Sequence, residues 1–170
     1  MKNKDYFKHK KITVVGLARS GLASANLLYD LGAKVSVTDN QDNNSTRAYA
    51  LELKSKNIEI EIGRHSQEFV RGQDLLVVSP GIPNTALPIA FAKQFKIPVI
   101  SEIELAWILC PATVIAVTGS NGKTTVTTLI GKVLEAKGEK VFICGNIGNP
   151  FCSEVQNLEA NNFVSLEVSS

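Results

Sequence analysis

The sequence predicts an α/β fold in which two parallel-sheet units follow one another along the chain. Short β-branched runs alternate with longer segments whose apolar residues recur at helical spacing, which favours parallel strands with helices on the faces of the sheet. Two glycine-rich turns, at 16–21 and 119–122, each follow a strand-like run and precede a helical one. The length of 170 residues suits one domain with part of a second.

In residues 1–100 the predicted elements follow the order β-α-β-α-β-β-α-β. The predicted strands are Lys11–Val15, Val35–Thr38, Ile58–Ile62, Leu75–Val78 and Val99–Ile100. The predicted helices lie at Leu22–Leu31, 46–56 and Leu87–Phe95. Isoleucine alternates with glutamate over 58–62, which predicts a half-buried strand. The wholly apolar Leu75–Val78 is typical of a strand that is covered on both faces.

A second unit follows the short connecting helix predicted at Glu102–Leu109, which Pro111 stops. Its predicted elements are strands at Thr113–Val117, Lys140–Cys144 and Phe163–Val168 and a helix at Lys123–Ala136. We therefore expect domains at 1–100 and 113–170, joined by a linker at 101–112. A parallel sheet as short as that of the second domain leaves an edge and a core face uncovered. We expect this domain to be incomplete and the chain to be the front part of a longer protein.

The composition is that of an ordinary globular chain. Hydrophobic residues make up 44% and charged residues 20%, near globular averages, which excludes a disordered or low-complexity chain. The net charge of +2 gives no nucleic-acid footprint. No apolar run approaches the roughly 20 residues of a membrane span, and the lysine-rich start lacks the apolar segment of a signal peptide. We expect a cytoplasmic monomer that binds neither nucleic acid nor membrane.

The cysteines and histidines do not form a recognisable site. Cys110, Cys144 and Cys152 are not spaced like a disulfide framework or a zinc site, and His9 and His65 lie far apart in the sequence. We interpret the cysteines as reduced thiols of a cytosolic protein and expect no metal at either histidine.

The first glycine-rich turn, Gly16–Gly21, resembles the dinucleotide fingerprint G-x-G-x-x-G with Ala18 in place of the middle glycine. Asp39 follows the second strand about twenty residues on, where such folds place a ribose-binding acid. Ser79, Pro80 and Gly81 end another strand and point to the same crevice. The pattern predicts a phosphate-bearing nucleotide at the carboxyl ends of these strands. Tight turns without any ligand remain the alternative for both segments.

The second glycine-rich turn, Thr118–Thr125, follows an apolar strand and opens a helix, which is the context of a phosphate-binding P-loop. Val117 stands where the full pattern has its first glycine, so this is a shortened G-x-x-G-K-T variant. Backbone amides would wrap the phosphate oxygens of ATP or GTP, Lys123 would neutralise the β- and γ-phosphates, and the Thr124 hydroxyl would bind Mg²⁺. The predicted fold class is thus a Rossmann-like parallel-sheet domain followed by the start of a P-loop α/β ATPase domain.

Taken together, these motifs resemble the Mur ligase family of peptidoglycan synthesis. Thr118–Thr125 matches its T-G-[ST]-N-G-K-[ST]-T loop, Cys144–Pro150 is similar to its G-N-I-G-x-P loop, and Leu166–Ser170 is similar to its E-x-S-S strand end. The N-terminal motifs resemble the D-glutamate-adding branch; they are Gly16–Gly21, Ser79–Pro83 and Ser101–Leu105.

The resemblance implies a role for each matching residue. The first domain would bind the uridine diphosphate part of UDP-N-acetylmuramoyl-L-alanine, not NAD. The diphosphate would meet Leu17, Ala18, Arg19 and Ser20, the uracil would lie near Asp39 and Asn40, and Ser79, Pro80 and Gly81 would flank the nucleotide. ATP would be held by Gly119, Ser120, Asn121, Gly122, Lys123, Thr124 and Thr125.

Two further residues would complete the machinery that the resemblance implies. Glu167 would ligate Mg²⁺ together with Thr124 and, with Lys123, would act in catalysis; a solvent-facing glutamate is the alternative. Asn146 would contact the muramoyl substrate, with a simple turn-forming role as the alternative.

The activity implied is ATP-dependent formation of an amide with D-glutamate through an acyl phosphate. The family's carbamylated lysine and amino-acid-binding domain lie outside these residues, so we expect residues 1–170 alone to be inactive. The alternatives are another Mur or folylpolyglutamate-type amide ligase, a non-catalytic module that holds a nucleotide sugar and, third, an NAD oxidoreductase.

Overall fold

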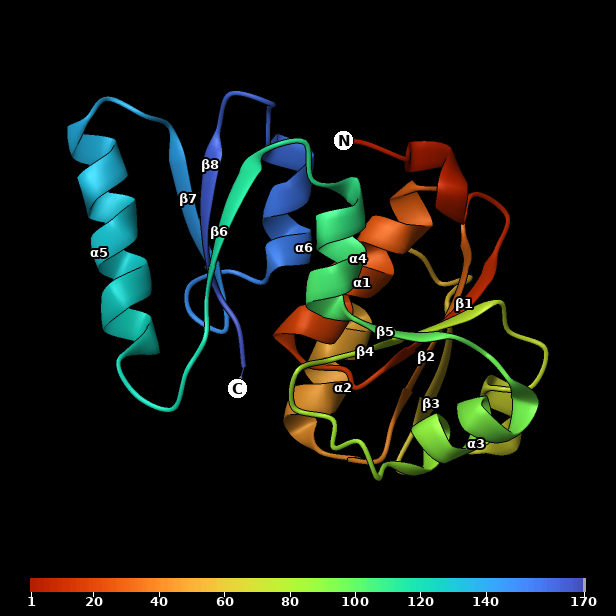
Figure 1. The fold of residues 1–170 in the computed structure, drawn as a ribbon. Coiled ribbons are helices and arrows are strands. Elements are labelled where there is room, and N and C mark those ends of the chain that lie inside the picture. The colour runs from red at the N-terminus through yellow and green to blue at the C-terminus, as the bar shows by residue number, and fades with distance from the viewer. Residues whose placement is uncertain (170) are drawn as a thin grey trace. The chain divides into compact units, whose positions relative to one another are not determined.

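The computed structural model describes residues 1–169, which form two compact α/β units, each with its own parallel sheet (Figure 1). One unit comprises Lys4–Leu105. The other comprises the residues from Ala106 onward together with Met1–Asn3. The division falls within helix α4 (Glu102–Leu109).

The first unit contains a five-stranded sheet whose strands are all parallel. Its strands are β1 (Lys11–Val15), β2 (Lys34–Asp39), β3 (Glu59–Ile62), β4 (Leu75–Val78) and β5 (Val99–Ser101). Their spatial order is β3-β2-β1-β4-β5. The chain runs outward from β1 in one direction and from β4 in the other, so the carboxyl ends of β1 and β4 mark the point where a doubly wound sheet opens a ligand crevice. The Rossmann-like fold predicted from the alternating pattern is confirmed.

Helices cover both faces of this sheet because right-handed crossovers from β1 to β2 and from β4 to β5 place their helices on opposite sides. The helices are α1 (Arg19–Asp30), α2 (Asn44–Leu51) and α3 (Leu87–Phe95), with short 3₁₀ turns η1 (Lys4–Phe7) and η2 (Gln67–Phe69). Phe91 and Phe95 of α3 pack against a buried core cluster that contains Val15, Leu76 and Ala92. This packing holds the ends of β1 and β4 in place beside the crevice.

The helix predicted at 46–56 is wrong at both ends, since α2 begins at Asn44 and ends at Leu51. Its start is set by Asn43, whose side-chain oxygen accepts the Thr46 amide at 2.9 Å and satisfies a first-turn donor. Its continuation is blocked because the Lys54 amide donates to the side chain of Asn26 on α1 at 2.9 Å, not to a helical carbonyl. Tertiary contacts therefore shorten a helix that local periodicity extends.

In strand β3 the burial is the opposite of what the Ile/Glu alternation suggests, which is buried isoleucine and exposed glutamate. Ile60 is 40% exposed, whereas Glu61 is only 7% exposed. The buried carboxylate is compensated by donors, among them the Ser66 amide at 2.8 Å and the Thr38 hydroxyl at 3.1 Å. A buried charge is tolerated in this way only when it is hydrogen-bonded.

The second unit contains a three-stranded parallel sheet in the order β6-β8-β7. Its elements are β6 (Thr113–Val117), α5 (Lys123–Ala136), β7 (Val141–Gly145), α6 (Phe151–Glu154), the 3₁₀ turn η3 (Val155–Asn157) and β8 (Phe163–Glu167). Figure 1 shows α5 and α6 on opposite sides of the sheet. The predicted bounds of β6 and α5 agree with the structure, whereas the short helix α6 was not predicted.

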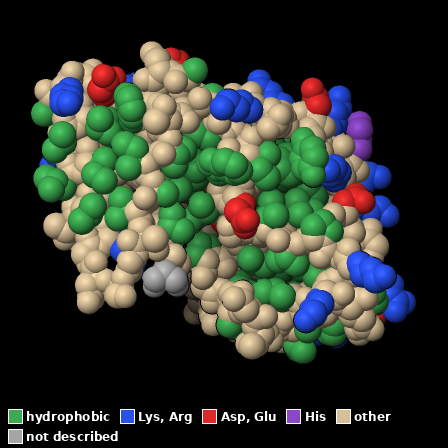
Figure 2. Space-filling model, in the orientation of Figure 1, with side chains coloured by type: hydrophobic (Ala, Val, Ile, Leu, Met, Phe, Trp, Pro, Cys, Tyr) green, Lys and Arg blue, Asp and Glu red, His purple; other side chains and the backbone are tan. Residues whose placement is uncertain are grey.

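The cysteines lie in the core, whereas part of α5 exposes apolar side chains. Cys110, Cys144 and Cys152 are buried and lie outside any disulfide, in agreement with the predicted reduced thiols, and burial raises the pKa of Cys110. Along α5 about half of each of three apolar side chains stays exposed (Figure 2); they are Val126, Leu129 and Val133. No helix within the described residues is long and apolar enough to cross a membrane.

Candidate functional site

The P-loop, Glu167 and the Asn146 loop converge at one edge of the second sheet. Val117, Glu167 and Gly145 are register partners, so the last residues of β6, β8 and β7 lie level with one another. The loops that follow β6 and β7 therefore begin side by side, with Glu167 between them. Parallel pairing of segments 50 residues apart brings together motifs that the sequence keeps separate.

The loop after β6 is shaped to receive an anion. Gly122 is the N-cap of α5 with a φ of +76°, in the left-handed region that favours glycine. A Cβ added at Gly119 or Gly122 would meet nothing within 4 Å, so the loop borders open space at both glycines. The first-turn amides of α5, which have no partner within the helix, and the positive end of its dipole face this opening.

Two polar contacts organise the side chains around the loop. The Lys123 ammonium donates to the Gly119 carbonyl at 2.6 Å. The Thr124 hydroxyl donates to Oε2 of Glu167 at 2.7 Å. Glu167 is only 6% exposed, which contradicts the alternative that this glutamate faces solvent.

The Thr124–Glu167 pair has the chemistry of a magnesium site. A hydroxyl and a carboxylate are hard oxygen ligands, and Mg²⁺ is typically bound by one or two such protein groups with substrate phosphates and water completing its shell. Residues 1–169 contain no group of three or more His, Cys, Asp or Glu side chains that could hold a metal unaided. The hydroxyl and the carboxylate of the pair could serve as two protein ligands of a metal whose other ligands are phosphate and water.

Asn146 is joined to the P-loop through Ser169, a residue to which sequence reasoning gave no role. The Asn146 side-chain amide donates to Oγ of Ser169 at 2.7 Å, and the Thr118 hydroxyl donates to the Ser169 carbonyl at 3.2 Å. The Asn146 backbone amide donates to the Glu167 carbonyl at 3.0 Å. The only sequence signal for Ser169 was its place in the E-x-S-S motif, whose last residue, Ser170, lies outside the described residues.

The first glycine turn lies at the crevice of the first sheet, between β1 and β4. The Gly16 amide donates to the Thr38 carbonyl at 2.8 Å, and the hydroxyl of the buried Ser79 donates to the Gly16 carbonyl at 3.1 Å. A Cβ added at Gly21 would lie 1.8 Å from the Gly16 oxygen, which explains the last glycine of the motif. Gly16, Gly21 and Ser79 thus meet where the sequence predicted a nucleotide.

Asp39, the last residue of the neighbouring strand β2, stabilises this turn through its carboxylate. Its Oδ2 accepts the Leu17 amide at 2.6 Å, and its Oδ1 accepts the Gln41 amide at 2.8 Å. The Leu17 side chain is buried, so only its backbone can serve the turn. Ala18 is the N-cap of α1 and contributes no side-chain cap, so α1 opens toward the turn with its first-turn amides and with the exposed Arg19.

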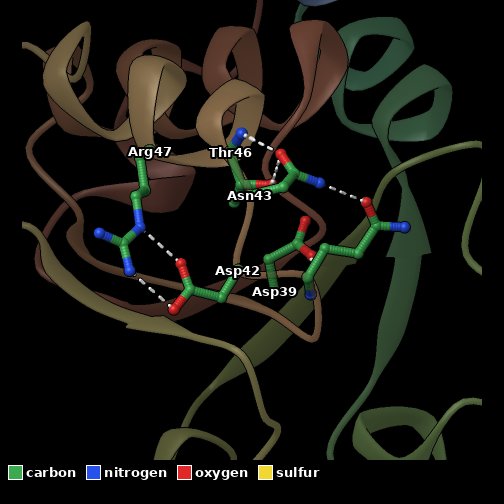
Figure 3. A network of polar contacts seen from close by, with 6 residues as sticks. Asp39, Asp42, Asn43, Thr46 and Arg47 are labelled. Atoms are coloured by element: carbon green, nitrogen blue, oxygen red, sulfur yellow. Dashed lines mark hydrogen bonds and ion pairs between the residues drawn. The ribbon is translucent and has the colours of Figure 1, made fainter.

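The loop after β2, which carries Asp39 and the exposed Asn40, is held by its own polar contacts (Figure 3). Asp42 and Arg47 form a bidentate pair at 2.6 and 2.9 Å, and the hydrogen bond from Arg47 lowers the pKa of Asp42. The Asn43 side chain caps α2 and donates to the Gln41 side chain at 2.9 Å. These hydrogen bonds and the ion pair hold the loop in one conformation next to the Gly16–Gly21 turn.

A cavity of about 510 Å³ lies elsewhere, at the amino ends of the strands of the first sheet. Its lining includes Lys11, Lys34 and Glu59, the first residues of β1, β2 and β3. None of the candidate site residues lines it.

Comparisons with known proteins identify both units. The family "Mur ligase MurD-like, N-terminal domain" matches residues 10–101, and "Mur ligase middle domain" matches residues 117–170. A UDP-N-acetylmuramoylalanine–D-glutamate ligase of Geotalea daltonii is 45% identical over 163 residues, which are 96% of this chain and 36% of that protein. The ligase of the same name from Macrococcus caseolyticus is 39% identical over 170 residues, 100% of this chain and 38% of that protein.

Solved structures support the same fold. The chain resembles UDP-N-acetylmuramate-alanine ligase from Thermotoga maritima with a TM-score of 0.55 and 23% identity over 95% of this chain and 37% of that one. The structure of UDP-N-acetylmuramate:L-alanyl-gamma-D-glutamyl-meso-diaminopimelate ligase from Neisseria meningitides gives a TM-score of 0.56 at 20% identity, over 94% of this chain and 52% of that one. The chain thus spans little more than a third of the curated relatives that it matches.

Proposed function

This chain belongs to the Mur ligase family, and we propose that it carries the uridine-nucleotide and ATP sites of a ligase that joins UDP-N-acetylmuramoyl-L-alanine to D-glutamate. The convergence of Lys123, Thr124 and Glu167 at one sheet edge carries this proposal. The names of the relatives at 39–46% identity supply the substrates.

ATP would be bound by the loop after β6. Backbone amides of Gly119–Thr125 would donate hydrogen bonds to its phosphate oxygens, and the Lys123 ammonium would leave the Gly119 carbonyl for the β- and γ-phosphates. Mg²⁺ held by Thr124 and Glu167 would replace their mutual hydrogen bond and supply charge neutralisation at the transferring phosphoryl group. Lys123 and the loop amides then stabilise charge in the transition state.

The uridine diphosphate group would be bound by the turn after β1. The first-turn amides of α1, near Ala18 and Ser20, suit a diphosphate, and Arg19 adds a charge-assisted donor at the same end. The loop with Asp39 and Asn40 would face the uracil, and Ser79 with Gly81 would flank the nucleotide. This assignment places the ligand at the strand-order reversal between β1 and β4.

The chemistry that follows is activation and amide formation. The alanyl carboxylate attacks the γ-phosphorus of ATP, the bond to the β-phosphate oxygen breaks, and ADP and an acyl phosphate form. The uncharged amine of D-glutamate attacks the acyl carbon, inorganic phosphate leaves, and the amine gives up one proton. Asn146 would orient the muramoyl substrate through its side-chain amide, and the protein contributes positioning and charge neutralisation without a covalent enzyme intermediate.

The test offers the full-length protein ATP, Mg²⁺, UDP-N-acetylmuramoyl-L-alanine and a panel of amino acids, and measures phosphate release. Release that depends on D-glutamate alone is the expected result. Release with another amino acid would favour a related amide ligase. Uridine nucleotide binding without any ATP turnover would favour a non-catalytic nucleotide-sugar module, and NAD binding would favour an oxidoreductase.

A further inference from the structure

The Glu61 carboxylate is the centre of a buried polar cluster in the first unit. Its Oε2 accepts the Ser66 amide at 2.8 Å and the Thr38 hydroxyl at 3.1 Å, and its Oε1 accepts Nε of Arg64 at 3.1 Å. Thr38 is completely buried, and Glu61 nearly so. Every group that contacts the carboxylate in these bonds is a donor, so the cluster requires Glu61 to be ionised.

The charges around the cluster agree with that requirement. Burial by itself would raise the pKa of Glu61, but hydrogen bonds from Ser66, Thr38 and Arg64 outweigh it and lower the pKa. Burial lowers the pKa of His65, against the opposing influence of Asp39 and Glu61. At neutral pH the cluster therefore holds an ionised carboxylate beside a neutral imidazole.

The Thr38 hydroxyl contacts His65, Glu61 and Arg64 at the same time. Its oxygen is 2.8 Å from Nδ1 of His65, 3.1 Å from Oε2 of Glu61 and 3.2 Å from the Arg64 carbonyl. The hydroxyl has one proton, and a carboxylate and a carbonyl can only accept. The consistent arrangement is that Nδ1–H of His65 donates to the Thr38 oxygen, which ties the segment after β3 to the end of β2.

The end of β2 in turn holds the glycine turn. The Thr38 carbonyl accepts the Gly16 amide at 2.8 Å, and the next residue, Asp39, accepts the Leu17 amide on its carboxylate at 2.6 Å. The Asp39 carbonyl accepts the Gly63 amide at 2.9 Å. Thr38 and Asp39, which accept the first two amides of the turn, are therefore both hydrogen-bonded to the segment 61–66 that surrounds the Glu61 carboxylate.

We propose that Glu61 is a positioning residue for the uridine diphosphate group, acting through Thr38 and Asp39 on the Gly16–Gly21 turn. This inference rests on the proposed function, because it takes that turn as the uridine nucleotide site. Glu61 does not itself contact the ligand. Its removal weakens binding of the uridine substrate and leaves the chemical step at the P-loop unchanged.

The experiment compares Glu61→Gln with Glu59→Gln in the full-length protein. Both residues lie on β3 and point to the same side of the sheet, but Glu59 is exposed. Glu61→Gln keeps the shape and replaces an acceptor oxygen by an NH₂ group that faces donors. We expect its Kd for UDP, measured by titration calorimetry, to rise about tenfold. The Kd for ATP stays unchanged, and Glu59→Gln behaves as the wild type.

Turnover provides the readout that separates positioning from general destabilisation. The KM for the uridine substrate rises with kcat unchanged. Wild-type UDP affinity in Glu61→Gln overturns the inference, and so does an equal loss of UDP and ATP affinity, which is the result of a merely structural role. A wild-type protein that does not bind UDP contradicts the proposed function itself, and the inference falls with it.

A second set of variants decides the matter if Glu61→Gln does not fold. Thr38→Val removes the central hydroxyl at nearly constant volume and is expected to weaken UDP binding in the same way. His65→Leu, which removes the donor, is expected to do so too, whereas His65→Asn keeps a side-chain N–H near the position of Nδ1 and restores binding. Unchanged UDP affinity in both Thr38→Val and His65→Leu overturns the inference.

Discussion

The Thr124 hydroxyl donates a 2.7 Å hydrogen bond to the Glu167 carboxylate across 43 residues of sequence. The bond joins the first turn of α5 to the carboxyl end of the central strand β8. It brings a hydroxyl and a carboxylate to the distance at which one cation can contact both. The P-loop and the strand-end glutamate are therefore in direct contact, as the proposed ATP and Mg²⁺ site requires.

If Glu167 ligates Mg²⁺ as proposed, replacing it with glutamine is expected to reduce ATP-dependent phosphate release at least 100-fold, because the variant loses the negative charge and keeps the shape of the site. The Mg²⁺ concentration that gives half-maximal activity rises in parallel. A magnesium titration of full-length enzyme activity measures both. Glu135→Gln, on the exposed part of α5, is the control, and an unaltered magnesium dependence in Glu167→Gln would contradict the metal role.

Replacing Lys123 with alanine is expected to remove ADP production and to spare binding of the uridine substrate. The ammonium that now donates to the Gly119 carbonyl is the group that would neutralise the phosphates, and the turn proposed to bind the uridine nucleotide belongs to the other compact unit. ADP release and UDP calorimetry measure the two effects separately. Lys132→Ala, farther along the same helix, is the matched control; undiminished turnover in Lys123→Ala would sink the assignment.

Local pattern was sufficient to predict most of the fold. β1, β4 and β6 are short apolar or β-branched runs bounded by turn residues, and their predicted bounds agree with the structure. The end of α2 could not be predicted, since it depends on Asn26, which lies 28 residues from Lys54 in the sequence. Contacts of this kind carry no local sequence signal.

The candidate site was predictable in its parts and not in its assembly. Glycine, lysine and threonine at fixed spacing after a strand identify the P-loop by mechanism. The position of β8 between β6 and β7, which brings Glu167 to Thr124, is a property of sheet order. The burial of Glu61 was hidden because its alternation with isoleucine suggested a solvent-facing side chain, and the donors of Thr38, Ser66 and Arg64 explain it.

Replacing Gly131 with alanine is expected to destabilise the protein by about 1–3 kcal/mol through overpacking. A Cβ at this position of α5 would lie 2.4 Å from Cδ1 and 2.6 Å from Cγ1 of Ile143 on β7, so the helix or the side chain must move. Urea denaturation measures the loss. Combining Gly131→Ala with Ile143→Val, which removes the nearer methyl, should recover part of the stability; a double variant no more stable than Gly131→Ala alone contradicts this cause.

Replacing Asn43 with alanine is expected to cost about 1 kcal/mol of stability, because the Thr46 amide at the start of α2 loses its acceptor. The loop that carries Asp39 also loses the contact between Asn43 and Gln41 (Figure 3). Thermal or urea denaturation provides the measurement. Asn44→Ala is a matched control one residue away in the sequence, on an exposed position, and equal effects of the two variants would argue against capping.

The stabilising effect of Glu61 is expected to depend on pH in one direction. Its pKa is lower in the folded protein than in the unfolded chain, where it has its ordinary value, so the unfolded state binds more protons as the solution becomes acidic. The contribution of Glu61 is therefore fully present above the ordinary pKa of a glutamate and declines as pH falls through the lowered folded-state pKa. Urea denaturation of wild type and Glu61→Gln at a series of pH values measures it. The difference in unfolding free energy should be largest near neutrality and shrink in acid, whereas a difference that grows toward acid would mean that the buried carboxyl is protonated in the native state and that donors do not hold it ionised.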